Sequence, residues 1–338
     1  MERPQLLAKM VRNPRVLGIV CMLFITLALP MPGLTAPTKA LGMWVWSKSS
    51  FSTEEARQNL VLFCTDHHIN HLDIHIEISS EGDKVFLPDA EALKDLIILA
   101  GRYNITTAAL RGSPKMFFSE NHDRTLRELQ AIIAFHESLP TDSHFKGIKY
   151  DVEPYRTKAW KEKGSSLKTV ILDYLTFLSR ARSLLREEAP NLWLAVDMPF
   201  WWDKDEYVIE FEGAAKRLSE HVQDLTDFAV IMSYRRDVEQ VLDCVKNERN
   251  YASRIEKVIF PALETVDLNQ DQYISFWEST TREFWDVVPR LQEAAEKDPA
   301  MGGLMLHCYR SLSKKFNRSA SDRAKKHRDP AKVLPELQ

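Results

Sequence analysis

Two carboxylates stand two positions apart in the segment Gly147-Ile-Lys-Tyr-Asp-Val-Glu153, namely Asp151 and Glu153. In an extended strand, residues i and i+2 point to the same face, about 6.6 Å apart at roughly 3.3 Å per residue. At that separation each negative charge raises the proton affinity of the other. A carboxyl group that stays protonated near neutral pH can act as a general acid. The pair therefore predicts acid catalysis, and the alternative is that both carboxylates form ion pairs with Lys149 and Arg111.

The elements that must position this pair follow from an alternation of strand-like and helical runs after residue 40. We expect strands over residues 42–46, 71–78, 106–111, 147–153, 192–199, 228–234, 257–264 and 303–309. Helical spacing of apolar residues predicts helices over 54–67, 89–102, 124–138, 167–188, 207–222, 238–254 and 276–297. Alternation of this kind without hairpin signals indicates parallel strands joined by right-handed crossovers.

Eight such repeats within residues 42–312 match the roughly 250 residues that are typical of a (β/α)8 barrel. A doubly wound open sheet is the competing α/β fold. It usually carries a glycine-rich phosphate loop after its first strand, and none is present here. The sequence therefore predicts a single-domain (β/α)8 TIM barrel over residues 37–312.

Within two of these strands, polar and aliphatic residues alternate. In residues 71–78 the odd positions are all polar, His71, Asp73, His75 and Glu77, and the even positions are all aliphatic. In residues 147–153 the polar set is Lys149, Asp151 and Glu153. Because side chains alternate between faces, we expect both polar sets to point into the barrel. Buried charges must pair or reach solvent, so they should lie near the C-terminal mouth, where barrel enzymes keep their sites.

The segment that ends in Glu153 resembles the fourth-strand signature of the chitinase-like glycoside hydrolases, family eighteen, which reads Gly, aliphatic, Asp, x, Asp, x, Glu. The resemblance implies that Glu153 protonates the glycosidic oxygen and that Asp151 orients the N-acetyl group of the substrate. Lys149 departs from the pattern, because the family has a third carboxylate at this position.

Two further segments resemble motifs of the same family. Val230-Ile-Met-Ser-Tyr234 is similar to the sixth-strand Met-x-Tyr, which implies that Met232 lines the site and that the Tyr234 hydroxyl contacts the reacting N-acetyl group. Arg235 stands where the family has Asp. Gly302-Gly-Leu-Met-Leu-His307 resembles Gly-Gly-x-Met-x-Trp of the eighth strand, with His307 in place of the Trp. Together the motifs imply cleavage of an N-acetylhexosamine-containing glycan, in which the substrate's own acetamide assists.

Two alternatives stay open. In a retaining glycosidase with two catalytic carboxylates, Glu153 after the fourth strand would be the acid and Glu264 at the end of the seventh would be the nucleophile. The large superfamily that uses this arrangement has Asn before the acid, where this chain has Val152. The other alternative is a catalytically inactive carbohydrate-binding barrel, which the departures from the family pattern motivate.

Aromatic residues near the same strand ends predict a carbohydrate cleft, because flat apolar rings stack on sugars. Trp44 and Trp46 share a face at the end of the first strand, and Trp202 follows the fifth. Asp197, also on the fifth strand, is expected to pair with Arg235 or to bind a sugar hydroxyl. The full set of candidate substrate-binding residues is Trp44, Trp46, Glu77, Arg111, Asp197, Trp202, Met232, Arg235 and His307.

The two ends of the chain differ from its body. A basic stretch to Arg15 precedes 14 apolar residues, 16–29, fewer than the roughly 20 that a spanning helix needs. Residues 1–36 therefore read as a signal peptide, which predicts a secreted or periplasmic protein without stable membrane insertion after cleavage. An uncleaved membrane anchor is the rival reading. Residues 313–338 form a basic tail that we expect to be solvated and flexible.

Charge and cysteine content limit the partners. Residues 1–36 carry +3 and residues 313–338 carry +5 of a formal net charge of -3, so residues 37–312 carry -11. Such an acidic body argues against nucleic acid and leaves a glycan as the expected partner. Cys64, Cys244 and Cys308 lie far apart, and no metal-ligand spacing occurs, so we expect neither a disulfide framework nor a metal or other cofactor. The sequence does not define an oligomeric state.

Overall fold

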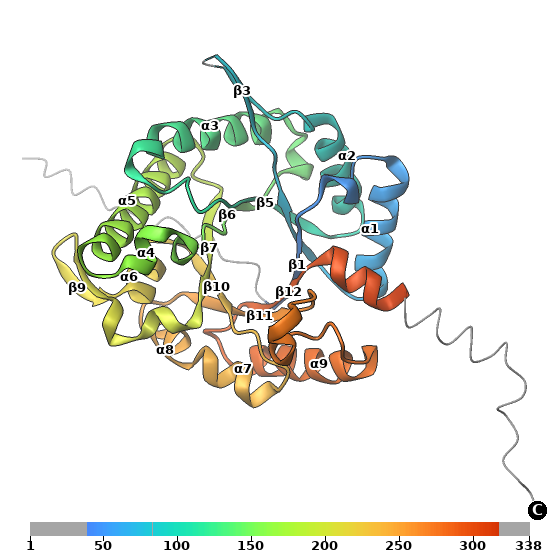
Figure 1. Cartoon of the computed structure of the whole chain (residues 1–338). Helices are drawn as coiled ribbons and strands as arrows, with labels where there is room; N and C mark the ends of the chain where they lie inside the picture. The colour runs from blue at the N-terminus through green and yellow to red at the C-terminus, as the bar shows by residue number, and fades with distance from the viewer. Residues whose placement is uncertain (1–38, 83, 318–338) are drawn as a thin grey trace, which may run out of the picture. The chain divides into compact units, whose positions relative to one another are not determined.

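Eight parallel strands close into a barrel in this computed structural model, which describes residues 39–82 and 84–317 (Figure 1). Going round the barrel, the strands are β1 (Ala40–Val45), β2 (His71–His75), β5 (Thr106–Arg111), β6 (Gly147–Tyr150), β7 (Trp193–Pro199), β10 (Phe228–Met232), β11 (Val258–Glu264) and β12 (Gly303–His307). The predicted (β/α)8 architecture is thereby confirmed.

Helices surround the strands (Figure 1). They are α1 (Glu54–Asp66), α2 (Ala90–Arg102), α3 (His122–Ser138), α4 (Lys158–Glu162), α5 (Gly164–Glu188), α6 (Leu218–Leu225), α7 (Val238–Cys244), α8 (Lys246–Arg254), α9 (Thr281–Lys297) and a last helix over residues 309–317. Short 3-10 turns lie in the connections, among them η4 (Pro154–Arg156) after β6 and η5 (Phe200–Asp203) after β7. The expected signal peptide and the tail beyond residue 317 lie outside the described residues. None of the helices within the described ranges combines the length and the hydropathy that crossing a membrane requires.

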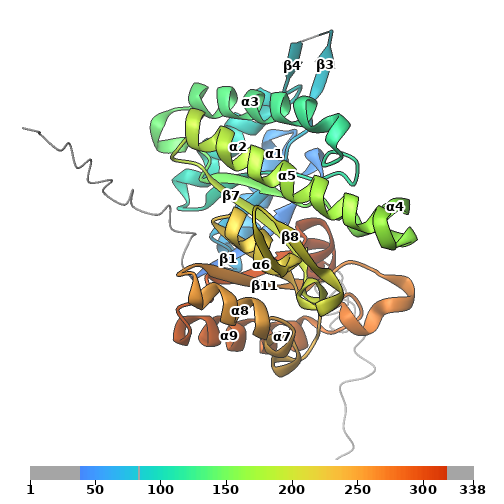
Figure 2. The same cartoon turned by 90° about the vertical axis from the view of Figure 1, so that its left-hand side faces the viewer.

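Two small antiparallel hairpins, for which no sequence signal was identified, stand outside the barrel (Figure 2). One pairs β3 (Ser79–Glu81) with β4 (Lys84–Phe86), and the other pairs β8 (Val208–Phe211) with β9 (Ala214–Arg217). The second hairpin replaces the first half of the helix that was expected over residues 207–222. Glu212 and Gly213 form its turn with φ of 50° and 80°, the left-handed backbone that tight hairpin turns require.

The barrel wall follows the predicted alternation. Leu72, Ile74, Ile148 and Tyr150 are buried under the surrounding helices, whereas Asp73 and Lys149 point into the barrel and pair there. A second apolar cluster fills the interior and includes Trp193, Phe228 and Phe260. The ring centroid of Phe228 lies 4.7 Å from that of Trp193 and 5.0 Å from that of Phe260. The interior is therefore closed by packed rings and carries a polar layer.

Replacing Gly303 with Ala should destabilise the fold at the seam between β12 and β1. Gly303 has φ of 145°, and a Cβ there would lie 2.0 Å from the carbonyl oxygen of Ala40, its register partner. We expect a loss of about 2 kcal/mol or more of unfolding free energy, measured by urea denaturation. Gly101→Ala in α2 is the control, since no atom there comes closer than 3.9 Å, and it should gain about 0.5–1 kcal/mol. Equal stabilities of the two variants would contradict this account of barrel closure.

Candidate active site

A buried ion cluster forms the polar layer of the barrel interior. The Lys149 ammonium is fully buried and lies 2.5 Å from Asp73 Oδ2 and 2.9 Å from Asp197 Oδ1. It also sits 3.8 Å from the ring centroid of Trp44, whose Nε1 donates to Asp197 Oδ2 at 2.9 Å. His71 Nε2 lies 3.0 Å from the other oxygen of Asp73. Side chains from β1, β2, β6 and β7 are thus held together by one cation.

The cluster leaves different pKa values on its two carboxyl groups. Burial disfavours the charge of Asp73, but Lys149 and His71 outweigh it and lower the pKa of Asp73. For Asp197 burial prevails over Lys149, and the nearby charge of Asp73 adds to it, so its pKa rises to about 6. Lys149 keeps its charge, because the two aspartates overcome its own burial and raise its pKa.

Asp151 follows β6, and the charges of Lys149 and Arg156 compensate only in part for its burial and its acidic neighbours. Its Oδ1 is shielded from solvent and has no hydrogen-bond partner among the described residues. Burial, followed by the charges of Asp197 and Glu153, raises its pKa well above the ordinary value. The alternative of ion pairs from Lys149 and Arg111 to this carboxylate pair is wrong. Lys149 is engaged by the ion cluster, and Arg111 makes its ion pair elsewhere.

Glu153 lies two residues further on, at the start of the loop after β6. It adopts a left-handed backbone with φ of 52° immediately before Pro154. The Tyr155 hydroxyl donates to its Oε1, and Arg156 Nη1 donates to its Oε2 at 2.7 Å. The side chain keeps 22% of its surface exposed, so a ligand in the mouth can reach it.

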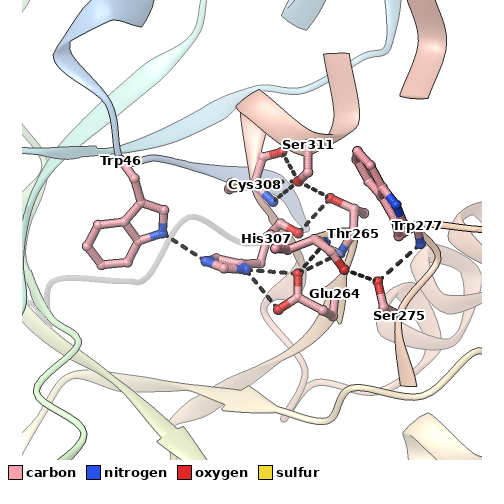
Figure 3. Close-up of polar contacts among 9 residues, drawn as sticks. Trp46, Glu264, Thr265, Ser275, Trp277, His307, Cys308 and Ser311 are labelled. Atoms are coloured by element: carbon pink, nitrogen blue, oxygen red, sulfur yellow. Dashed lines mark hydrogen bonds and ion pairs between the residues drawn. The ribbon is translucent and has the colours of Figure 1, made fainter. Parts of the chain in front are cut away.

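Glu264 ends β11 and is fixed by neutral donors (Figure 3). Its Oε1 accepts the backbone N–H groups of Thr265 and Val266, both at 2.7 Å. His307 Nδ1 lies 3.0 Å from both carboxylate oxygens. Trp46 Nε1, which can only donate, donates to His307 Nε2 at 2.8 Å. Because Nε2 accepts this bond, the imidazole proton sits on Nδ1 and points at Glu264.

Tyr234 follows β10 and lies near the carboxyl groups of both Glu264 and Asp151. Its ring stacks on His307 with centroids 6.3 Å apart and planes at 24°. Burial raises the pKa of its hydroxyl well above the ordinary value, and the charges of Glu264 and Asp151 raise it further. Met232 Sδ lies 4.0 Å from the Tyr155 hydroxyl. The expected catalytic residues Asp151, Glu153, Tyr234 and Glu264 therefore meet at one mouth, together with Trp46, Met232 and His307.

Two of the tryptophans that were expected in the cleft are instead buried. Trp202 has no exposed surface and stacks on Trp160 at 6.0 Å, with Tyr174 against it at 5.6 Å. Trp44 is 1% exposed beneath Lys149. Neither ring presents a free face to a sugar, so their assignment as stacking residues is wrong. Of the three tryptophans, only Trp46 remains half-buried at the mouth.

Two charged residues, Glu77 and Arg111, also depart from their expected positions. Because β2 ends at His75, Glu77 lies at the rim, where it pairs with Lys48 at 3.1 Å. Arg111 turns to the helix layer, donating to the Ile76 carbonyl at 2.7 Å and pairing with Glu128 of α3.

Asp197 pairs with Lys149 and not with Arg235. Arg235 itself donates to the Tyr234 carbonyl at 2.7 Å. The expected pair between Arg235 and Asp197 is therefore wrong.

Sequence reasoning missed Tyr155 and Arg156, which bind the Glu153 carboxylate. Their position directly after Glu153 was the available signal, since a turn brings residues i+2 and i+3 back to residue i. Within residues 39–82 and 84–317, no group of three His, Cys, Asp or Glu side chains has a geometry that could hold a metal ion. The three cysteines of this part of the chain are free thiols.

No family model and no curated protein sequence matches this chain. Solved structures do resemble it. The endo-β-1,4-mannanase of Thermotoga petrophila is 12% identical with a TM-score of 0.51, over 80% of this chain and 68% of that one. The exo-β-1,4-mannosidase of Opitutaceae bacterium strain TAV5 is 10% identical with a TM-score of 0.56, over 80% and 52%. Bacteroides uniformis β-glucuronidase 2 is 13% identical with a TM-score of 0.53, over 80% and 30%.

These likenesses define the class of fold, a (β/α)8 barrel of the kind that glycoside hydrolases use. At identities this low they carry the fold and not the activity. None of the three is a chitinase, so the likenesses carry the barrel fold and do not point to family eighteen in particular.

Replacing Lys149 with Met should destabilise the barrel strongly. The change leaves Asp73 and Asp197 buried without their cation, and removing one partner of a buried pair typically costs about 3–5 kcal/mol. Lys48→Met breaks the exposed pair with Glu77 and should cost less than about 1 kcal/mol. Urea denaturation of both variants measures the difference. Similar small losses would show that the ion cluster is not needed for stability.

Replacing Asp151 with Asn should stabilise the protein more at pH 8 than at pH 4.5. A raised pKa means that the native state holds a proton which the unfolded chain loses above its ordinary pKa of 3.8. The native state is therefore progressively destabilised as pH rises through the raised pKa, and Asn removes that dependence. Denaturation at the two pH values, with the exposed Asp66→Asn as the control for one charge, measures it. A difference from wild type that stays constant with pH would contradict the raised pKa.

Proposed function

We propose that this protein is a retaining glycoside hydrolase in which Glu153 is the general acid and base and Glu264 is the nucleophile. The observation that carries the proposal is the position of the two carboxylates. One follows the fourth strand of the barrel and the other ends the seventh, and both border the same mouth. The likeness to mannanase, mannosidase and glucuronidase barrels supports a glycoside as the class of substrate.

The environment of Glu264 suits a nucleophile. Its Oε1 takes two backbone N–H bonds and the His307 proton, which keep the carboxylate oriented without a cation. Oε2 shares only the His307 proton and is the freer oxygen. In the first step Oε2 attacks the anomeric carbon, the bond to the leaving oxygen breaks, and a glycosyl ester forms on Glu264.

The environment of Glu153 suits proton transfer. Its carboxyl group is reachable from the mouth and lies beside Asp151, whose own raised pKa keeps a second acidic proton nearby. In the first step Glu153 gives its proton to the leaving oxygen. In the second it takes a proton from water, whose oxygen attacks the anomeric carbon and releases Glu264. Tyr155 and Arg156 orient the carboxylate between the steps.

A second candidate function is substrate-assisted hydrolysis of an N-acetylhexosaminide, as the family-eighteen resemblance implies. The observation in its favour is Asp151, which has an unpartnered Oδ1 and a raised pKa beside Glu153. Tyr234 supplies the hydroxyl that this mechanism uses. It requires an N-acetyl group beside the reacting carbon, whereas the two-carboxylate mechanism does not. Secretion of the enzyme, and a glycan substrate met outside the cytoplasm, are part of either proposal and rest on residues 1–36.

Covalent trapping tests the nucleophile. The solved β-glucuronidase 2 carries a covalently bound cyclophellitol-6-carboxylate aziridine, a reagent that reports an enzyme nucleophile. We expect incubation of the full chain with manno-, gluco- and glucurono-configured cyclophellitol aziridines to add the mass of one reagent for at least one configuration. Peptide mapping should place it on Glu264, and Glu264→Gln should not react.

Turnover of aryl β-glycosides tests the acid. Glu153→Gln should lower kcat by about 10²–10⁴-fold, because one general acid contributes on that order. Glu239→Gln, an exposed change on α7, is the control and should leave kcat unaltered. Activity confined to N-acetylhexosaminides without labelling would favour the second candidate. Glycan binding by calorimetry without any turnover would identify a binding barrel.

A further inference from the structure

A cavity of about 360 Å³ opens beside the mouth. Its walls come from η5, from the residue after Tyr234 and from α7, and the lining residues are Phe200, Asp203, Arg235, Gln240, Asp243 and Cys244. The volume falls in the range of small-molecule sites, roughly 300–1,000 Å³. None of the reactions proposed above uses this cavity.

Several polar groups in the cavity are uncommitted. Arg235 uses Nη1 for the Tyr234 carbonyl, and its guanidinium lies 5.1 Å from the Phe200 ring centroid. Among the described residues no carboxylate comes within ion-pair distance of it. Within the same part of the chain, the side chains of Gln240 and Asp243 form no hydrogen bond, and Asp203 commits only Oδ2, to Asn247 at 2.5 Å. Guanidinium, amide and carboxylate atoms therefore remain available to a ligand.

This set of groups matches the hydroxyls of a sugar ring. Arg235 and Gln240 can donate to hydroxyl oxygens, and Asp203 and Asp243 can accept hydroxyl protons in charge-assisted bonds, which are stronger than neutral ones. Two carboxylates against one guanidinium give the cavity an excess of negative charge. That balance disfavours a uronate and favours a neutral hexose.

The cavity lies next to the residues of the catalytic mouth. Arg235 directly follows Tyr234, and Trp201, between lining residues Phe200 and Asp203, packs on Tyr155 at 5.4 Å. Tyr155 in turn donates to Glu153. A sugar held in the cavity therefore lies on the side of the mouth where the acid stands.

We infer that this cavity is a subsite for a neutral hexose unit of an oligosaccharide, adjacent to the reacting unit, with Asp243 and Arg235 as its main polar contacts. The inference rests on the proposed function for the position of the reacting unit, but the binding itself does not require turnover. It assigns the protein to chain-like substrates that extend beyond one sugar.

The test is calorimetric titration of the full chain, carried in the Glu153→Gln background to prevent turnover. The probes are mannohexaose, cellohexaose, hexa-N-acetylchitohexaose and, as the acidic arm, hexamannuronate. We expect at least one neutral hexaose to bind, and Asp243→Ala to weaken it about tenfold, the effect of one charged hydrogen bond. Glu239→Ala removes a charge from the same helix outside the cavity and should leave the affinity unchanged.

Each outcome separates this inference from the proposed function. Unaltered affinity in Asp243→Ala, tighter binding of hexamannuronate, or binding of none of the hexaoses overturns the subsite. Asp243 is exposed and has no partner to lose within the described residues, and a melting curve checks that the variant stays folded. If hexaose binding depends on Asp243 but the wild type hydrolyses nothing, the subsite is supported and only the proposed function is refuted. If the wild type hydrolyses a glycoside but Asp243→Ala binds the hexaose with unaltered affinity, the proposed function is supported and the subsite is refuted.

Discussion

The ion cluster of Lys149, Asp73 and Asp197 is the constraint on which the mouth of this barrel depends. A barrel interior of this size is normally filled by packed side chains, and isolated charges in it are expensive. Here one ammonium lies against two carboxylates and the face of Trp44. These polar contacts link side chains from four strands, β1, β2, β6 and β7. The apolar rings of Trp193, Phe228 and Phe260 close another part of the interior. The mouth is thereby built on a layer in which charged groups are paired and packed against aromatic rings.

Because that cation is fully used, the carboxylates of the mouth fall into distinct environments. Asp151 is half-buried beside other acids, with Oδ1 shielded from solvent, and gains proton affinity. Glu153 has Arg156 and solvent. Glu264 has only neutral donors, from two backbone N–H groups and His307. Carboxyl groups that share one site but differ in environment can take opposite roles in proton transfer and nucleophilic attack, and this separation supports assigning the acid to strand four and the nucleophile to strand seven.

The sequence predicted the barrel because period-two and helical spacing report which face of an element is buried. It also brought Asp151, Glu153, Tyr234 and Glu264 to one mouth, since parallel strands end at the same edge. Periodicity could not distinguish a hairpin from a helix over residues 208–217. There the left-handed backbone at Glu212 and Gly213 forms the turn of a hairpin. Nor could it tell which Trp keeps a free face. Trp202 is covered by Trp160 of α4 and Tyr174 of α5, contacts between segments that no local pattern encodes.

The three departures from the family-eighteen motifs form a connected set in the structure. Lys149, where the family has a carboxylate, instead pairs with Asp73 and Asp197 and offsets only part of the rise in the pKa of Asp151. His307, where a Trp would form a floor, accepts from Trp46 and donates to Glu264; an indole has one donor and no acceptor, so it could not do both. Arg235 donates to the Tyr234 carbonyl and lines a neighbouring cavity. One of these changes, His307, holds the Glu264 carboxylate in place at the end of strand seven. The contact between His307 and Glu264 therefore favours the proposed two-carboxylate glycosidase over the family that the motifs resemble.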